Sequence, residues 1–333
     1  MSESLSLPLI EARLWHPVCE ASALAAEPLP ARLLGQDIVL WRDAAGQAHA
    51  FIDQCPHRGA RLSLGRVCED RLTCLYHGWA FEGDGRCASI PAVPGFKPPA
   101  SHAARAFAVA ERHGLLWVRL LQEGDDPGVP RFDAEADARL RKVLCGPYDV
   151  ASSAPRIVEN FLDMSHFGFV HTGILGDLAH TETPPYQVSV DARGVHVRDV
   201  RAWQPQSNRL SAEGSWVSYG YEVPAPYTAV LSKAPDAQAG YSESIALFVC
   251  PAEPERSRVW VRLAVPDFSS SDEQLRAFQD GIFMQDAPIV ESQRPRLLPI
   301  TDAVVREVHS AADRSSTAYR RYLREQGITF GVC

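Results

Sequence analysis

The fold of the first part of this chain is decided by two stretches, Cys55-Pro56-His57-Arg58-Gly59 and Cys74-Leu75-Tyr76-His77-Gly78-Trp79. Each stretch supplies one thiol and one imidazole, spaced Cys-x-His in the first and Cys-x-x-His in the second. Thiolates suit soft or borderline metals, and imidazole suits zinc, copper and iron. The two stretches therefore predict two paired loops that bind one metal centre.

Two kinds of metal centre fit this donor set. In a Rieske [2Fe–2S] cluster, two histidines replace two of the four cysteines on one of the irons. Cys55 and Cys74 would then bind one iron, and His57 and His77 the other. A tetrahedral zinc site is the alternative, but zinc modules usually group their cysteines together and their histidines together. One cysteine and one histidine in each loop favours the Rieske cluster.

A second group of polar residues lies in the stretch 159–171. Asn160, Asp163 and His166 are spaced i, i+3, i+6, which on a helix places them along one face. His171 lies off that face on a straight helix, but Gly168 lets the chain deviate and brings both imidazoles to one metal. Two histidines and one carboxylate with open positions form the facial triad of non-haem iron(II) oxygenases. The stretch thus predicts two of the three ligands of such an iron.

The two motifs, in this order, resemble the catalytic α-subunits of the Rieske non-haem iron oxygenases. The resemblance extends from Trp15 to the C-terminus. The length and the tail 318–333 are most similar to the single-component, homotrimeric members, a group that contains vanillate and dicamba demethylases, caffeine N-demethylases and guanidinium-alkaloid hydroxylases. The resemblance implies one Rieske [2Fe–2S] cluster and one mononuclear non-haem Fe(II) per chain.

The resemblance also implies roles for the residues of the second motif. His166 and His171 would ligate the mononuclear iron. Asp163 would bridge an iron-ligand histidine and a Rieske histidine from a neighbouring subunit. Asn160 matches a polar position close to the iron.

The third iron ligand is expected from a distant part of the chain. Residues 283–293 resemble the C-terminal helix in which the family carries an aspartate that completes the triad. We expect Asp286 to be this ligand. Asp280 and Glu291 are its rivals, because any helix carries acidic residues that face solvent.

The pattern along the chain predicts an α+β protein of two domains, at 1–122 and 123–333. Short β-like runs between Gly and Pro turns over 8–120 predict an all-β Rieske domain with the cluster loops at one tip. The polar, turn-rich segment 123–128 marks the boundary. Alternating strands over 186–265 and a helix over 272–293, capped by Ser271 or Asp272, predict a catalytic domain with an antiparallel sheet gripping a long C-terminal helix.

Composition indicates a cytoplasmic enzyme. A formal net charge of −8 argues against a nucleic-acid surface, and 46% hydrophobic residues provide an ample core. The sequence shows no secretory signal and no apolar stretch long enough to cross a bilayer. Cysteines outside the two loops show no disulfide framework and are expected to be reduced; they are Cys19, Cys68, Cys87, Cys145, Cys250 and Cys333.

The expected activity is hydroxylation or O-/N-demethylation of a small aromatic or heterocyclic substrate with O2. A cis-dihydroxylating dioxygenase uses the same metals and is the alternative, whereas an electron carrier would need only the first domain. No Gly-x-Gly-x-x-Gly follows a strand, so we expect a separate NAD(P)H-dependent reductase with flavin and possibly a ferredoxin domain. Arginines around the loops are candidates for docking it, namely Arg58, Arg61, Arg66 and Arg71.

The substrate pocket is the least determined part of the sequence. Aromatic residues on the predicted strands are candidates to line it, although strands favour aromatics in any case. These candidates are Trp203, Trp216, Tyr219, Tyr221, Tyr227 and Phe248.

Overall fold

The computed structural model describes residues 9–301 and 305–333, which fall into two compact units, one that ends at Val129 and one that begins at Pro130. The boundary predicted from sequence lies a few residues earlier, after residue 122. The eight cysteines are all free thiols. No helix among the described residues is long and apolar enough to span a membrane.

The first unit is built from two antiparallel sheets. The larger sheet has the order β1 (His16–Glu20), β10 (Leu115–Arg119), β9 (Ala106–Arg112), β4 (Ala48–Ile52), β3 (Gln36–Arg42) and β2 (Leu29–Leu33). The smaller has the order β5 (Arg66–Cys68), β6 (Arg71–Thr73), β7 (Ala80–Phe81) and β8 (Cys87–Ser89). The only α-helical segment among the unit's described residues is the short α1 (Leu9–Ala12). The predicted all-β character of this domain is confirmed.

The hydrophobic core of the first unit lies directly beneath the predicted cluster loops. Trp41, Phe51 and Phe81 are fully buried there, together with the thiols of Cys55 and Cys74. Cys55 follows β4, and Cys74 lies between β6 and β7, so one loop comes from each sheet. Packing against the core fixes where both loops begin.

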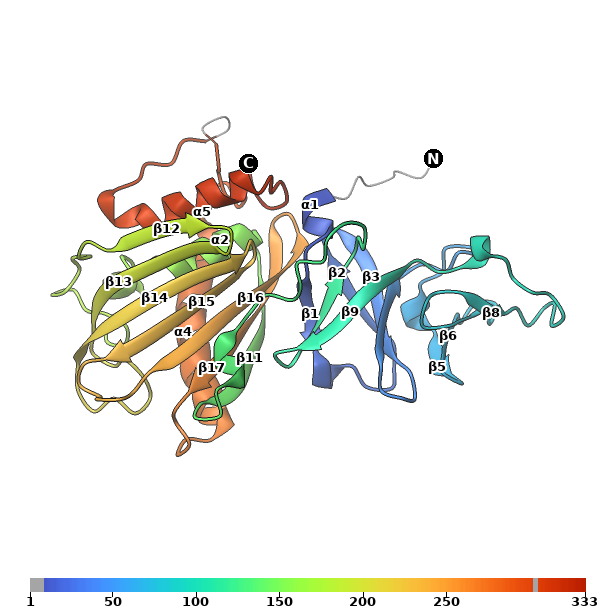
Figure 1. Cartoon of the computed structure of the whole chain (residues 1–333), viewed down its shortest axis with the longest axis horizontal. Coiled ribbons are helices and arrows are strands. Elements are labelled where there is room, and N and C mark those ends of the chain that lie inside the picture. The colour runs from blue at the N-terminus through green and yellow to red at the C-terminus, as the bar shows by residue number, and fades with distance from the viewer. Residues whose placement is uncertain (1–8, 302–304) are drawn as a thin grey trace. The chain divides into compact units, whose positions relative to one another are not determined.

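The second unit is a seven-stranded antiparallel sheet covered by helices (Figure 1). The strand order is β11 (Arg141–Val150), β17 (Arg256–Val265), β16 (Glu243–Glu253), β15 (Thr228–Pro235), β14 (Ser215–Ala225), β13 (Gly194–Gln204) and β12 (Gln187–Asp191). The helices are α2 (Ala154–Leu162), α3 (Phe167–Val170), α4 (Asp272–Ser292) and α5 (Arg314–Glu325).

The long helix α4 begins where the sequence places its cap. Ser271 accepts a hydrogen bond from the Gln274 backbone, and the Gln274 side chain accepts one from the Ser271 backbone N–H, which forms a capping box. The helix contacts β11 and α2, and Figure 1 shows it passing behind the strands of the sheet. The predicted α+β fold, with an antiparallel sheet and a long C-terminal helix, is confirmed.

The prediction that one helix carries Asn160, Asp163 and His166 along one face is wrong beyond Leu162. Helix α2 ends there, and Asp163 is the C-cap, with an extended backbone. The Asp163 carboxylate accepts a hydrogen bond of 2.8 Å from the Ser165 backbone N–H. Aspartate side chains that bond the backbone two residues on compete with helix formation. The chain therefore turns at Asp163, and His166 becomes the N-cap of α3.

Gly168 has a different role from the expected one. It lies within α3, and a Cβ atom there would come within 2.8 Å of the Asp177 carbonyl oxygen. Glycine is thus required at this position by the close approach of the segment around residue 177, because only a residue without a side chain leaves that space.

Candidate metal centres

The two loops of the first unit share one backbone design. The Cys55 N–H donates to the Ala60 carbonyl, and the Cys55 carbonyl accepts from Gly59, at 2.8 and 2.9 Å. In the second loop the Cys74 N–H donates to the Trp79 carbonyl, and the Cys74 carbonyl accepts from Gly78, at 2.9 and 3.0 Å. The two glycines have φ of +72° and +70°, in the left-handed region that glycine occupies without strain.

The loops bring the four predicted cluster residues together. The His57 and His77 rings lie 4.5 Å apart, and the His57 ring stacks on Trp79 at 4.6 Å. The His57 Nδ1 atom is buried and has no hydrogen-bond partner among the described residues. Burial raises the pKa of Cys55 to about 11, and the neighbouring Cys74 contributes in the same direction. Two adjacent buried thiols, which would ionise on metal binding, and an unpartnered imidazole nitrogen fit a shared metal cluster.

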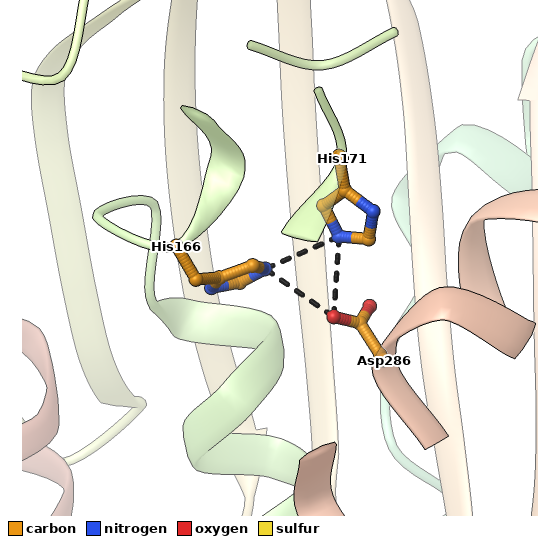
Figure 2. A group of neighbouring side chains, drawn as sticks. All are labelled: His166, His171 and Asp286. Carbon is orange, nitrogen blue, oxygen red and sulfur yellow. Dashed lines mark hydrogen bonds and ion pairs between the residues drawn. The ribbon is translucent and has the colours of Figure 1, made fainter. Parts of the chain in front are cut away.

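In the second unit, three side chains converge on one point (Figure 2). The Nε2 atoms of His166 and His171 are 3.2 Å apart. Oδ1 of Asp286, from α4, lies 3.4 Å from the first and 3.1 Å from the second. The residues come from the two ends of α3 and from the middle of α4, so their approach depends on the packing of the helices.

The other ring nitrogens of both histidines are held in place. Nδ1 of His166 donates to the Asp163 carboxylate at 3.0 Å, and Nδ1 of His171 donates to the Gln285 side-chain oxygen at 2.8 Å. With the proton on Nδ1, each Nε2 presents a lone pair to the other and to the Asp286 carboxylate. Three electron pairs that face one another without a proton between them fit a bound cation.

The structure separates Asp286 from its two rivals. Asp280 accepts a hydrogen bond from the Tyr148 hydroxyl, and Glu291 accepts one from the Ala151 backbone. Both contacts tie α4 to β11 and the segment after it, away from the histidines. Asn160 donates to Asp286 Oδ1 at 3.4 Å, so it lies beside these three residues.

A largely apolar pocket opens beside the three residues. Its floor is one face of the sheet, because every lining residue from β14 to β17 has an odd number and strand side chains alternate between faces. Of the six aromatic candidates, Tyr219 and Tyr221 line it. Phe161 and Phe167 also line it, and the Phe167 ring contacts both histidine rings, at 5.1 and 5.8 Å.

The remaining aromatic candidates lie elsewhere. Trp203 and Trp216 pack against each other, and Trp203 stacks on His180 at 5.0 Å. Tyr227 and Phe248 are buried; the Tyr227 hydroxyl donates to the Phe330 carbonyl, and Phe248 packs on Phe132. Alternation alone did not separate these from Tyr219 and Tyr221, since all of them fit a strand.

Sequence reasoning missed several residues of the site besides Phe161 and Phe167, among them Gln285, Lys233 and Glu243. Gln285 directly precedes the predicted ligand Asp286, but no spacing rule pointed to its contact with His171. Lys233 and Glu243 line the pocket as a buried ion pair of 2.9 Å. A lysine and a glutamate at inward positions of predicted strands are unusual, but only the strand register shows that the two side chains pair.

The arginines proposed for docking divide into two groups. Arg61 pairs with the buried carboxylate of Asp53 at 2.9 Å, and Arg71 pairs with Glu82 at 2.9 Å. Arg58 and Arg66 are exposed.

Two family models match this chain, the Rieske [2Fe-2S] domain over residues 14–103 and the vanillate O-demethylase oxygenase C-terminal domain over residues 150–326. The chain belongs to the Rieske oxygenases. It is therefore an oxidoreductase that incorporates oxygen from O2, and its cofactors are a Rieske cluster and a mononuclear non-haem iron. The expectation of this family is confirmed, as is the argument against an electron carrier.

Similar proteins cover nearly the whole chain. Methylxanthine N1-demethylase NdmA from Pseudomonas putida is 34% identical over 93% of this chain and 88% of its own length. A solved structure of NdmA with caffeine has a TM-score of 0.84 at 31% identity, covering 95% of this chain and 91% of that one. Oxidoreductase NdmD from the same species is 40% identical over 35% of this chain and 20% of its own length. Of these relatives, the demethylase NdmA favours hydroxylation or demethylation over ring dihydroxylation as the reaction of this chain.

Proposed function

We propose that this chain is the oxygenase component of a demethylase that removes a methyl group from a nitrogen or oxygen atom of a small heterocyclic or aromatic molecule. The observation that carries the proposal is the convergence of His166, His171 and Asp286 at the edge of an apolar pocket. Similarity to a methylxanthine N1-demethylase and to the vanillate O-demethylase oxygenase domain supports the same reaction.

We assign the two metal sites as follows. His166, His171 and Asp286 would bind the mononuclear iron, which would supply the activation of O2. Cys55 and Cys74 bind one iron of the Rieske cluster, and His57 and His77 bind the other. Asp163 and Gln285 hold the iron-binding histidines in the required orientation.

The pocket residues position the substrate for oxidation of a methyl C–H bond. Apolar side chains of the sheet and of α4 exclude water from the pocket. The methyl group is the part of the substrate that would reach the iron. One oxygen atom of O2 enters the C–H bond, and the other leaves as water with two electrons and two protons. The hydroxymethyl product then loses formaldehyde and leaves an N–H or O–H group.

The electrons come from outside the pocket. The local similarity to oxidoreductase NdmD supports a separate reductase partner, for which we propose NAD(P)H and flavin as the electron source. We propose that Asp163 links the iron site to the Rieske cluster of a neighbouring chain. The assembly is then a head-to-tail homotrimer, because a heterologous interface closes into a ring when its rotation permits.

Single turnover of the anaerobically reduced holoenzyme with labelled O2 tests the function. The substrates are matched N-methyl, O-methyl and plain aromatic compounds, and the products are analysed by mass spectrometry. We expect loss of one methylene and one formaldehyde per turnover. Products that gain two labelled oxygens and two hydrogens would overturn the demethylase assignment.

A further inference from the structure

Polar side chains form a continuous row across the floor of the pocket. In the strand register, Tyr219 on β14 lies opposite Lys233 on β15, and Lys233 lies opposite Glu243 on β16. The adjacent row contains Tyr221 opposite Leu231, with Ile245 opposite Leu231 on the far side. Directly opposite side chains on one sheet face lie about 5 Å apart. Tyr219 is therefore an immediate neighbour of Lys233, and the Tyr221 ring stacks on the Tyr219 ring at 5.8 Å.

The charges that line the pocket outside the iron triad are already compensated. Lys233 pairs with Glu243, whose second oxygen accepts from the Tyr241 hydroxyl. Arg209 donates to the Ser270 hydroxyl, which in turn donates to Asp267. The lining thus holds two cations and two carboxylates, in two linked pairs. Although burial alone lowers the pKa of Lys233, the charge of Glu243 outweighs it, and the pKa is raised; the ammonium stays charged.

In contrast, some hydrogen-bond donors of the pocket lining have no acceptor within the described part of the chain. The Tyr221 hydroxyl is buried and has no partner among the described residues. The Tyr219 hydroxyl accepts from the Gln204 side-chain amide at 2.6 Å, which still leaves it a proton to donate. Lys233 uses two of its three N–H groups, on the Ser207 carbonyl and on Glu243. Buried polar groups normally have partners, so these donors indicate a ligand.

The carboxylate acceptors of the pocket lining outside the iron triad are occupied. Both oxygens of Glu243 and both oxygens of Asp267 already accept hydrogen bonds. Burial raises the pKa of both Tyr219 and Tyr221, so the two phenols keep their protons and remain donors. What the floor of the pocket lacks is an acceptor.

We propose that Tyr219, Tyr221 and Lys233 form a donor row that binds a carbonyl oxygen or an unprotonated ring nitrogen of an uncharged substrate. This inference rests on the proposed function, and it defines the substrate class as neutral N- or O-methyl compounds that carry such an acceptor. The acceptor lies away from the methyl group that is removed, because the Phe167 ring stands between the histidine rings and Tyr219, 6.2 Å from the latter.

A carboxylate fits this row less well than a carbonyl group. Glu243 already balances the charge of Lys233, so a bound carboxylate would leave one buried negative charge without a counter-ion. Burial of an unpaired charge costs far more than burial of a neutral hydrogen-bonded group. The row therefore selects against anionic aromatic acids as well as for carbonyl compounds.

Isothermal titration of the holoenzyme with three probes tests the row. The probes are 1-methylquinolin-2-one, which has a lactam carbonyl, 1-methylindole, which has none, and 4-methoxybenzoate, which is an anion. We expect the lactam to bind most tightly to the wild type. Tyr221→Phe should weaken lactam binding about tenfold and leave 1-methylindole unchanged, because a buried hydrogen bond is lost only with the carbonyl ligand.

A control and a second variant keep the test decisive. Tyr221→Phe should unfold at the wild-type temperature or higher, since the lost hydroxyl has no partner within the protein. Tyr227→Phe, outside the pocket, should leave lactam binding unchanged. Lys233→Met/Glu243→Gln removes the ion pair together and should also weaken lactam binding, whereas Glu243→Gln alone leaves Lys233 without its counter-ion and should reduce the discrimination against 4-methoxybenzoate.

Three results would overturn the donor row. They are equal effects of Tyr221→Phe on the lactam and on 1-methylindole, tightest binding of 4-methoxybenzoate, and no binding of the lactam. Formaldehyde release is measured separately with all three probes. Demethylation of 4-methoxybenzoate alone would retain the proposed function and reject the row.

Discussion

His171 is fixed by two contacts of different chemistry. Its Nε2 faces Asp286 at 3.1 Å, and its Nδ1 donates to Gln285 at 2.8 Å. Gln285 and Asp286 are consecutive on α4, so one turn of helix supplies both the proposed ligand and the acceptor that orients its neighbour. A neutral amide oxygen sets the tautomer without adding a charge, in contrast to the carboxylate of Asp163 on His166.

Gln285→Met should weaken binding of the mononuclear iron at least tenfold, because it removes the acceptor while it keeps a side chain of similar length. The Rieske cluster, in the other unit, should be unaffected. Iron content after dialysis against a graded chelator, together with the visible spectrum of the cluster, measures both. Met284→Leu, an exposed neighbour on α4, is the matched control. Wild-type iron retention in Gln285→Met would refute the role of this contact.

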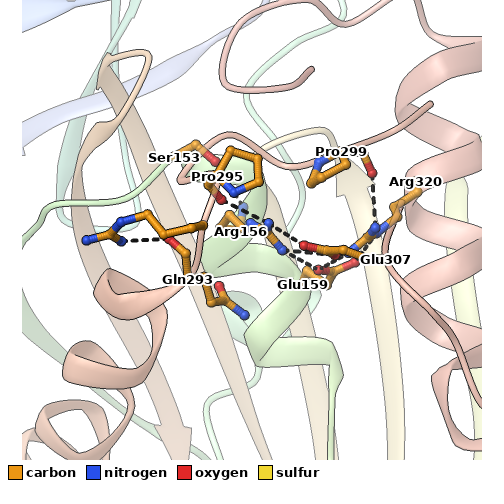
Figure 3. A network of polar contacts seen from close by, with 9 residues as sticks. Ser153, Arg156, Glu159, Gln293, Pro295, Pro299, Glu307 and Arg320 are labelled. Atoms are coloured by element: carbon orange, nitrogen blue, oxygen red, sulfur yellow. Dashed lines mark hydrogen bonds and ion pairs between the residues drawn. The ribbon is translucent and has the colours of Figure 1, made fainter. Parts of the chain in front are cut away.

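At the scale of elements, a network of buried and half-buried charges joins α2 to α5 and to the segment that follows α4 (Figure 3). Arg320 on α5 donates to Glu159 at 2.6 and 2.8 Å. Arg156 on α2 and Arg320 both donate to Glu307, and Arg156 also donates to the Pro295 carbonyl. Because Glu159 directly precedes Asn160, the network fixes the end of α2 that reaches the iron site.

The network makes folding sensitive to acid through Glu307. Burial alone raises the pKa of Glu307, but hydrogen bonds from Arg156 and Arg320 outweigh it and lower the pKa below the ordinary value of 4.5. A carboxylate with a depressed folded-state pKa stabilises the protein above its unfolded pKa, and this contribution disappears as the pH falls through the folded value.

Glu307→Gln should therefore be less stable than the wild type at neutral pH, and the difference should shrink as the pH falls below about 4.5. Denaturant unfolding of both proteins over a series of pH values measures this. Glu325→Gln, which changes an exposed carboxylate of α5, is the control and should leave the profile unchanged. A constant difference between Glu307→Gln and wild type at every pH would contradict the assignment.

The sequence predicted those elements whose signals are local. Spacing within two short loops indicated the four cluster residues, and the capping residues placed the start of α4. The end of α2 was not predicted, because the i, i+3, i+6 pattern is equally compatible with a helix and with a turn closed by the Asp163 side chain. Lys233 and Glu243 were missed for a different reason: they pair across neighbouring strands, and only the register reveals such a contact.

At the scale of the whole molecule, each chain carries two separate compact units, one for each proposed metal site. Asp163, which holds His166, is partly exposed, so its carboxylate is accessible to another molecule. If electrons pass between chains at this point, the catalytic unit is a pair of domains from two different subunits of the ring.

Co-expression of two inactive variants tests this arrangement. Cys74→Ser removes a proposed cluster ligand, and His171→Ala removes a proposed iron ligand, so each homo-oligomer should be inactive. In randomly mixed rings, about a quarter of the junctions join an intact cluster to an intact iron site, and activity should return to about a quarter of wild type. Absence of activity in the mixture, with both proteins folded and assembled, would place electron transfer within one chain.

The alternation of side chains across the floor of the pocket has a consequence for how this protein diversifies. All lining residues from the four strands occupy odd positions, while the even positions of the same strands point to the opposite face of the sheet. The contribution of the sheet to ligand preference thus comes from a small set of residues on one face. They are Tyr219, Tyr221, Leu231, Lys233, Glu243, Ile245, Leu247, Val261, Leu263 and Val265. A library of variants confined to these positions would sample new ligand specificities without altering the other face of the sheet. A one-residue insertion in any of the strands would instead move the side chains of that strand from one face to the other.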